Sequence, residues 1–175
     1  VSESAIDIAN YEAVDPTSQT LNIRIEEGDT AVLNVITFYY KEKEATINYV
    51  AVGPEGATDF GSVSPTSEKV KVLTGTAQGS TATANNAPTF RFVGWYKDKA
   101  CTQPVDSNWV DDNNKLTPVK ADDAAWTDTT YYAKFEEDQA TINYVAVGPE
   151  GLKTDGTPND TVAGSVDPGS ETLSV

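Results

Sequence analysis

The side chains that could carry chemistry in this sequence are three tryptophans, several acidic loop segments and one cysteine. Histidine is absent, which removes the most frequent general base and the commonest transition-metal ligand. The single cysteine, Cys101, cannot form an intrachain disulfide, and its expected role is that of a small apolar filler. From these absences we predict that the chain is not an enzyme, holds no metal and takes no cofactor.

The aromatic residues are the best candidates for ligand binding, because the faces of aromatic rings pack on the apolar faces of sugars. Trp95 and Tyr96 form one adjacent pair, although the strand pattern around them favours packing in a core. Trp109 and Trp126 are surrounded by Asn and Asp residues and are better candidates for exposed rings. The alternative for both is that they cover the end of a small core. The ligands predicted for such a surface are host glycans or glycoproteins.

Two acidic segments could supply oxygen ligands to Ca²⁺. They are residues 111–114, with the sequence Asp-Asp-Asn-Asn, and Asp155 together with Asn159 and Asp160. Neither segment has the alternating Asp spacing and the distal Glu of a helix–loop–helix Ca²⁺ site. Both are therefore expected to be solvated acidic loops.

Lys134 is a candidate for a Lys–Asn isopeptide cross-link, with Asn48 or Asn143 as its partner. Such a cross-link needs a buried lysine beside an asparagine and a catalytic carboxylate. The alternation of apolar and polar residues places Lys134 opposite the apolar face of its strand, so its ammonium group is expected in water and no cross-link is predicted. The carboxylates of Glu136 and Glu137 fall in a short polar segment, where no buried acid–base pair is expected.

The charge balance excludes two classes of partner. Lys and Arg number 12 and Asp and Glu 27, which gives a net charge of −15. A chain this acidic repels phosphate backbones and anionic headgroups, so neither nucleic acid binding nor membrane insertion is expected. The single Cys and the absence of Met and His fit an extracellular protein that avoids oxidisable side chains. No signal peptide or anchor is present, and we expect these to have been trimmed from a longer, secreted chain.

The elements that position these residues come from an internal repeat. The dodecamer ATINYVAVGPEG occupies residues 45–56 and again residues 140–151, an offset of 95. The tripeptide Gly-Ser-Val at 61–63 returns at 164–166, an offset of 103, so the second copy has eight more residues in the loop between the two blocks. An identical dodecamer indicates recent duplication within a repeat array.

The repeat divides the chain into three predicted parts. Residues 45–139 form a complete repeat, residues 140–175 the N-terminal part of the next repeat, and residues 1–44 the C-terminal part of a preceding β repeat. Polar joints of four residues, at 41–44 and 136–139, are too short to act as flexible linkers. Neighbouring repeats of the same chain are therefore expected to lie close together in a string.

Alternation with a period of two predicts strands over residues 21–26, 34–40, 46–51, 70–73, 90–94 and 131–135. No sustained helical stripe is present, and residues 120–126 could form at most one or two helical turns. Residues 74–88, rich in Gly, Ser, Thr, Ala and Asn, are predicted to form a loop. The predicted class is mainly β (a β-rich α+β class), with small repeats strung end to end.

Three motifs carry a resemblance to a known family. They are Phe-Val-Gly-Trp-Tyr-Lys-Asp at 92–98, Leu-Thr-Pro at 116–118 and Thr-Tyr-Tyr-Ala-Lys-Phe at 130–135. Together they resemble the Listeria–Bacteroides repeats, the group that includes the internalin B-repeats, over roughly residues 45–139. The resemblance implies a β-grasp-like (ubiquitin-like) fold and no catalytic residues. This repeat is longer than the typical member, with residues 74–88 and 106–114 as the expected additions.

The resemblance also implies a role. Units of this family occur in cell-wall-attached proteins as stalks or adhesive segments, and residues 1–44 resemble the end of a mucin-binding-type repeat because both close in a strand like 34–40. The expected function is that of a stalk in an adhesin on a bacterial cell surface, in a protein of the Gram-positive type. The alternatives are a module that binds host glycoprotein or mucin, and an accessory repeat of a secreted enzyme.

Overall fold

The computed structural model describes residues 1–23, 34–85, 89–145 and 166–174. These residues form thirteen strands in five sheets, with one short 3₁₀ turn, η1 (Ser107–Trp109), and no α-helix. The predicted mainly β class is therefore confirmed. Within the same residues, no helix has the length and apolar character needed to cross a membrane.

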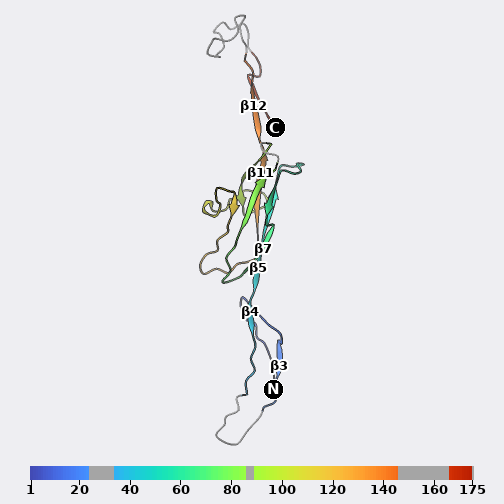
Figure 1. Cartoon of the computed structure of the whole chain (residues 1–175), viewed down its shortest axis with the longest axis vertical. Coiled ribbons are helices and arrows are strands. Elements are labelled where there is room, and N and C mark those ends of the chain that lie inside the picture. Colours follow the sequence, from blue (N-terminus) through green and yellow to red (C-terminus); the bar gives the residue numbers. More distant parts are fainter. Residues whose placement is uncertain (24–33, 86–88, 146–165, 175) are drawn as a thin grey trace.

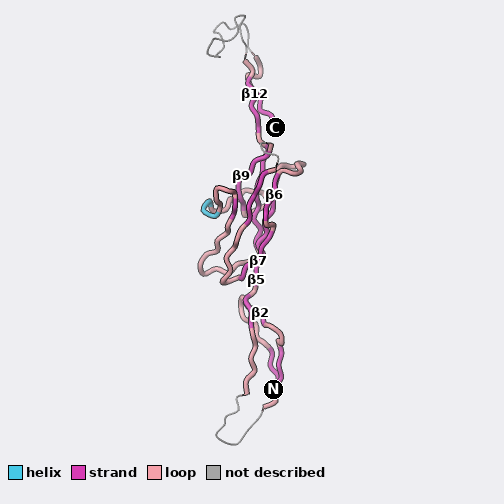
Figure 2. Tube along the Cα trace, in the orientation of Figure 1, coloured by secondary structure: helices cyan, strands magenta, loops and turns pink. Residues whose placement is uncertain are grey.

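The elements follow one another along the long axis of the molecule (Figures 1 and 2). Strands β1 (Ser2–Ser4) to β4 (Tyr40–Glu42) lie at one end, and β5 (Glu44–Val52) to β11 (Thr129–Glu137) form the widest part in the middle. The paired strands β12 (Gln139–Asn143) and β13 (Ser170–Ser174) lie towards the other end. Every residue of the buried hydrophobic cluster comes from the middle part, between Ala45 and Phe135. We refer to residues 44–138 as the central unit.

A four-stranded mixed sheet forms the centre of this unit, in the order β7-β5-β11-β9. Its strands are β7 (Ser67–Lys71), β5 (Glu44–Val52), β11 (Thr129–Glu137) and β9 (Phe90–Tyr96). The first and last strands of the unit, β5 and β11, pair in parallel, while β7 and β9 are antiparallel at the edges. The predicted alternation is observed: Ile47 and Tyr49 on β5, and Tyr131, Ala133 and Phe135 on β11, are buried.

A second sheet of three strands closes the core. It has the order β10-β8-β6, with β6 (Gly61–Ser64), β8 (Ser80–Ala84) and β10 (Lys115–Leu116). Its side chains Val63, Ala82 and Leu116 belong to the same cluster as Ile47 and Trp95 of the larger sheet. The two sheets therefore share a single core.

The prediction of a loop over residues 74–88 is wrong, because β8 lies within it. Ser80 and Ala82 are buried on one face of β8, and Thr81 and Thr83 alternate with them. Small residues at these positions allow β8 to lie at the centre of its sheet, against the core. The composition resembles that of a loop, but the Thr residues suit a strand, so this segment is a structural part of the unit.

A β-bulge on β9 brings two separated aromatic residues to the same face. Gly94 pairs with Lys134 and Phe92 with Phe135, so Val93 has no opposite residue on β11. The additional residue shifts the alternation by one position. As a result Trp95 faces the core together with Phe92, with the ring centroids 6.2 Å apart.

Two predicted strands differ from the structure, and the possible helix at residues 120–126 is not formed. Residues 120–126 contain no helix and form a single turn closed by the hydrogen bond from Ala124 N to Ala121 O. The predicted strand over 34–40 is absent except at Tyr40, where β4 (Tyr40–Glu42) begins. Of the predicted strand 21–26, residues 21–23 are not in a strand and the rest lies outside the described residues.

The N-terminal part consists of two narrow antiparallel pairs without a buried cluster of its own in the described residues. Strand β1 (Ser2–Ser4) pairs with β3 (Ser18–Thr20), and β2 (Tyr11–Ala13) pairs with β4. Its side chains are exposed or half-buried. This part therefore depends on hydrogen bonds and on its attachment to the central unit.

Candidate functional site

Trp95 lies in the core and is 2% exposed. Its Nε1–H donates a hydrogen bond of 2.9 Å to the carbonyl oxygen of Asn114. Its ring meets Tyr49 edge to face, at 5.8 Å between centroids. The structure therefore leaves no open ring face for a sugar at Trp95, and the core packing that the strand pattern favours is observed.

Trp126 covers the end of the core and is 7% exposed. Its Nε1–H donates to the carbonyl oxygen of Gly75 at 2.9 Å, and its backbone N–H donates to Val72 at 2.8 Å. These bonds attach residues 119–126 to the turn that follows β7. Trp126 is a closing residue of the core, which was also the alternative for this position.

Trp109 and Tyr96 are the two aromatic candidates that remain half-buried. Trp109 packs edge to face on Tyr131, with the centroids 6.4 Å apart, and the ammonium group of Lys97 lies 5.7 Å from the centre of its ring. The cation over the ring is a contact that aromatic faces favour. Among the four candidates, these two keep part of their surface exposed.

The carboxylate of Asp111 accepts hydrogen bonds from the backbone of its own turn. Its Oδ1 accepts hydrogen bonds from the backbone N–H groups of Asn113 and Lys115, both at 2.9 Å. No group of three or more acidic, His or Cys side chains in the described part of the chain is placed to hold a metal ion. The second acidic segment, Asp155 with Asn159 and Asp160, lies outside the described residues.

Cys101 is half-buried in a turn organised by Asp98, a residue that the sequence did not single out. The Asp98 carboxylate accepts from Thr102 N and Gln103 N. Burial alone would raise the pKa of Asp98, but these hydrogen bonds outweigh it and lower the pKa. Burial raises the pKa of the Cys101 thiol in spite of the opposing charge of Lys134, so the thiol stays protonated at neutral pH and is a poor nucleophile.

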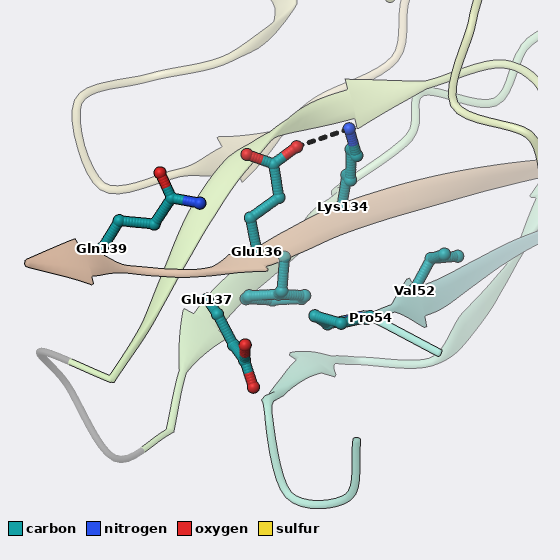
Figure 3. Close-up of a pocket in the computed structure, with 8 residues that line it drawn as sticks. Val52, Pro54, Lys134, Glu136, Glu137 and Gln139 are labelled. Atoms are coloured by element: carbon teal, nitrogen blue, oxygen red, sulfur yellow. Dashed lines mark ion pairs between the residues drawn. The ribbon is translucent and has the colours of Figure 1, made fainter. Parts of the chain in front are cut away.

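Lys134 points away from the core and forms an ion pair with Glu136, with 2.6 Å between Nζ and Oε1 (Figure 3). About a third of its side chain is exposed. Asn48 pairs with Thr130, four residues earlier on β11, so it does not face Lys134. The expected position of Lys134, opposite the apolar face, is observed.

A groove of about 310 Å³ lies where the central unit meets β12, and Figure 3 shows the residues that line it. Val52 and Pro54 come from the end of β5, Glu136 and Glu137 from the end of β11, and Gln139 from the start of β12. We call residues 136–139 the C-terminal joint. The polar groups of the lining are the Lys134 ammonium paired with the Glu136 carboxylate, the Glu137 carboxylate and the Gln139 amide.

Arg91 connects three elements at this joint. Its guanidinium group lies 2.8 Å from Glu136 Oε2 and 3.1 Å from Asp138 Oδ1. The backbone N–H of Asp138 also donates to Thr89 O at 2.8 Å. Exposed ion pairs add little stability one by one, but this network connects β9, β11 and the joint at the point where the chain leaves the unit.

The opposite joint, residues 41–44, is held by one carboxylate that the sequence did not indicate. Glu42 accepts three hydrogen bonds, from Leu73 N at 2.5 Å, Thr74 N at 2.8 Å and Thr74 Oγ1 at 2.8 Å. Burial alone would raise the pKa of Glu42, but the hydrogen bonds from Thr74 and Leu73 outweigh it, so the pKa lies below its ordinary value. Glu42 thus attaches the N-terminal part to the turn after β7. We call residues 41–44 the N-terminal joint.

Within each four-residue joint, only one residue lies between two strands. Lys43 alone separates β4 from β5, and Asp138 alone separates β11 from β12 (Gln139–Asn143). The backbone of Lys43 is itself bonded, donating to Asn10 O at 2.8 Å and accepting from Val72 N at 3.0 Å. The chain therefore passes from part to part as nearly continuous strand, with no free linker at either joint.

Comparisons with models of known protein families, with curated proteins and with solved structures found no match to this chain.

Proposed function

We propose that this chain is a non-catalytic stalk segment of a bacterial cell-surface protein, and that its central unit transmits tension between neighbouring repeats. The observation that carries the proposal is the parallel pairing of β5 and β11. The chain enters the central unit at the start of β5 and leaves it at the end of β11, and these two strands are direct neighbours in the sheet.

This pairing determines how a pulling force acts on the unit. Because β5 and β11 are parallel, the entry and exit points lie at opposite ends of the pair, and tension acts along the strands. Six residue pairs, from Ile47 with Thr129 to Val52 with Lys134, are then loaded together in shear. Hydrogen bonds that must break together resist force better than bonds that open one after another, because the barrier to forced unfolding is then higher.

The joints support the same proposal. A stalk needs neighbouring units whose relative directions are fixed, since a free linker would fold back and shorten it. Glu42 and Arg91 hold the two joints by hydrogen bonds and ion pairs. The strands of the three parts run along the long axis, as Figure 2 illustrates.

The proposal extends to the fold family. We propose a β-grasp-like repeat related to the Listeria–Bacteroides repeats, on the basis of the motifs at 92–98 and 130–135 and of the central parallel pair. Their aromatic residues have structural roles here: Trp95 and Tyr131 lie in the core. The three-stranded sheet takes the place across the core where a helix would be expected in a β-grasp unit. An extracellular position on the cell wall follows from the stalk role.

Single-molecule pulling tests the mechanical role. In a Cys101→Ser background, the chain is held at its two termini and stretched at constant velocity. The expected record has one main unfolding event of high force, from the central unit. The matched control holds the same protein through cysteines at Glu44 and Thr127, two exposed positions at the same end of the β5–β11 pair.

Comparing the unfolding forces in the two pulling directions shows whether the resistance comes from the parallel strand pair or from the overall stability of the unit. Tension between Glu44 and Thr127 opens the strand pair from one end, so the unfolding force should be several-fold lower than between the termini. Equal forces in the two directions would show that the parallel pair does not determine the resistance, and the stalk proposal would lose its main support.

A second candidate function is binding to host glycans or mucin. It is favoured by the half-buried Trp109, which carries Lys97 over its ring. Saturable binding of the folded chain to mucin that is lost in Trp109→Ala, and kept in a Lys120→Ala control, would establish an adhesive module. Absence of binding would leave the stalk proposal as the remaining one.

A further inference from the structure

The paired strands β12 and β13 repeat the paired strands β5 and β7 of the central unit. Strand β13 (Ser170–Ser174) pairs with β12 in the register Ala140 with Leu173, as β7 pairs with β5 in the register Ala45 with Val70. The offsets of 95 and 103 that relate the two sequence blocks also relate the paired residues. The pair β12–β13 is therefore the structural counterpart of β5–β7.

The two strand pairs also have matching hydrogen bonds. The hydroxyl of Tyr49 donates to Glu68, and the hydroxyl of Tyr144 donates to Glu171. The backbone N–H of Tyr49 donates to Thr66 O at 2.8 Å, and that of Tyr144 donates to Gly169 O at 3.0 Å. Each residue of the second set is related to the first by the offset of its strand, so the two strand pairs share both register and these contacts.

The two strand pairs differ in burial. Ile47 and Tyr49 are 0% and 2% exposed, whereas their counterparts Ile142 and Tyr144 are 39% and 41% exposed. Leu173, the counterpart of the buried Val70, is exposed as well. These apolar side chains form an uncovered face on a structure whose duplicate is covered.

In the central unit, other strands cover the apolar face of β5–β7. The second edge of β5 pairs in parallel with β11, and the residues after β7 supply β8, β9 and β10. In the part of the chain that the structure describes, β12 pairs with β13 and with no second strand. Among the described residues, no strand occupies the edge of β12 that corresponds to the β11-binding edge of β5.

We propose that β12–β13 is an acceptor for a segment with the sequence pattern of residues 73–138, whose last strand pairs with β12 in parallel. The pattern that fits is that of β11, in which Tyr131, Ala133 and Phe135 lie beside Ile47 and Tyr49 of the neighbouring strand on the same buried face of the sheet. The same three residues would meet Ile142 and Tyr144, which are identical to their counterparts. The occupant is the remaining part of a repeat.

The test extends the protein by its own sequence. Residues 73–138 are appended after Val175, which is the counterpart of Val72, and amide hydrogen exchange is compared with that of the 175-residue chain. We expect the protection of residues 140–144 to rise by about 100-fold or more, to the level of residues 45–49. Unchanged protection of residues 140–144 in the extended chain would overturn the proposal.

Two variants of the extended chain test whether the additional protection requires the apolar face of β12–β13 or arises from any extension of the chain. Ile142→Lys places a charge on the apolar face and should abolish the additional protection. Thr172→Lys is the matched control, because the counterpart of Thr172 is Lys69, which is exposed in the complete unit. Equal loss in both variants, or in neither, would contradict the proposed arrangement.

A second copy of the chain is the competing occupant. Sedimentation of the 175-residue chain distinguishes it, since edge-to-edge pairing of β12 would give a dimer in which residues 140–144 are already protected. A monomer with weak protection supports the proposal, and a dimer that Ile142→Lys dissociates overturns it.

Discussion

The hydroxyl of Tyr49 on β5 donates a hydrogen bond of 2.5 Å to the carboxylate of Glu68 on β7. The same carboxylate accepts from the backbone N–H groups of Gln78 and Gly79, at 2.8 Å and 2.9 Å. Burial alone would raise the pKa of Glu68, but these three hydrogen bonds outweigh it and lower the pKa. One side chain thereby connects the two sheets that enclose the core.

Replacing Glu68 with Gln should destabilise the central unit. The amide presents one acceptor oxygen in place of two and loses the charge, so at least one of the three donors is left without a good partner. Hydrogen bonds to charged groups contribute about 1.5–3 kcal/mol, and with partial solvent exposure the expected loss is about 1–2 kcal/mol. Urea unfolding at neutral pH measures it, and Glu55→Gln, in an exposed turn, should change the midpoint little. Equal effects of the two changes would contradict the role of Glu68.

The stability should fall at acid pH. The pKa values of Glu42 and Glu68 are lowered from 4.5 in the folded state, so the unfolded chain binds more protons as the pH decreases. Their contribution is present above pH 4.5 and is lost as the pH falls through the lowered values. The difference in unfolding free energy between the wild type and Glu68→Gln should be constant near neutrality and shrink below pH 4.5. A difference that stays constant down to pH 3 would contradict the prediction.

The stability of the central unit should also fall at alkaline pH, because of Tyr49, the hydrogen-bond partner of Glu68. Burial, together with the hydrogen bond to Glu68, raises the pKa of Tyr49 above 10.0. A raised pKa means that the folded state keeps the proton longer, so the contribution of Tyr49 is present below pH 10 and is lost as the pH rises further. Tyr49→Phe should reduce the loss of stability measured by urea unfolding between pH 9 and pH 11. The matched change Tyr39→Phe, at an exposed position, should leave it unaltered.

The sequence predicted the part of the fold in which alternation and burial agree. The buried positions of β5 and β11 followed from the period of two, and so did the outward position of Lys134. The aromatic strand pattern favoured packing for Trp95, but it did not show that Trp95 shares a face with Phe92, because the bulge at Val93 reverses the alternation before it. A bulge depends on the opposite strand, which a single segment of sequence does not contain.

The joints could not be predicted beyond their length. Glu42 receives its hydrogen bonds from Leu73 and Thr74, which lie more than thirty residues away. Likewise β8 was missed because its Ser, Ala and Thr residues have the composition of a loop, and its central place in the sheet depends on β6 and β10. Long-range contacts determined both features; the Thr residues of β8 are a weak local signal for a strand, and Glu42 has no such signal.

Glu42 should control the angle between the N-terminal part and the central unit. Glu42→Ala removes three hydrogen bonds at the joint while leaving the core residues in place. Spin labels at the exposed Ser18 and Thr83, in a Cys101→Ser background, should give a clearly broader distance distribution in this variant. Glu12→Ala, which removes the exposed ion pair with Lys41, is the control and should keep the distribution narrow. An unchanged width in Glu42→Ala would show that other contacts hold the joint.

Two glycines with the same backbone conformation should differ in their tolerance of a side chain. Gly56 has φ +79° with open space around its missing Cβ, whereas Gly79 has φ +85° and its Cβ would lie 1.9 Å from the carbonyl oxygen of Leu116. Gly56→Ala should cost about 1–2 kcal/mol for the left-handed conformation. Gly79→Ala adds a clash with backbone and should cost about 3 kcal/mol or more. Thermal and urea unfolding would measure both, and similar losses would mean that the β10 backbone can move away.

Substitutions of Trp95 and Trp109 should differ in their effect on stability, because Trp95 lies in the core and Trp109 is half-buried. Trp95→Phe removes the N–H that Asn114 O accepts and leaves a void in the aromatic cluster, so the expected loss of unfolding free energy is about 2–3 kcal/mol. Trp109→Phe keeps an edge-to-face contact with Tyr131 at a half-buried position and should cost less than about 1 kcal/mol. Urea unfolding followed by circular dichroism measures both without depending on tryptophan emission. If Trp109→Phe were the more destabilising, Trp109 would belong to the core and the case for a ligand-binding surface around it would be lost.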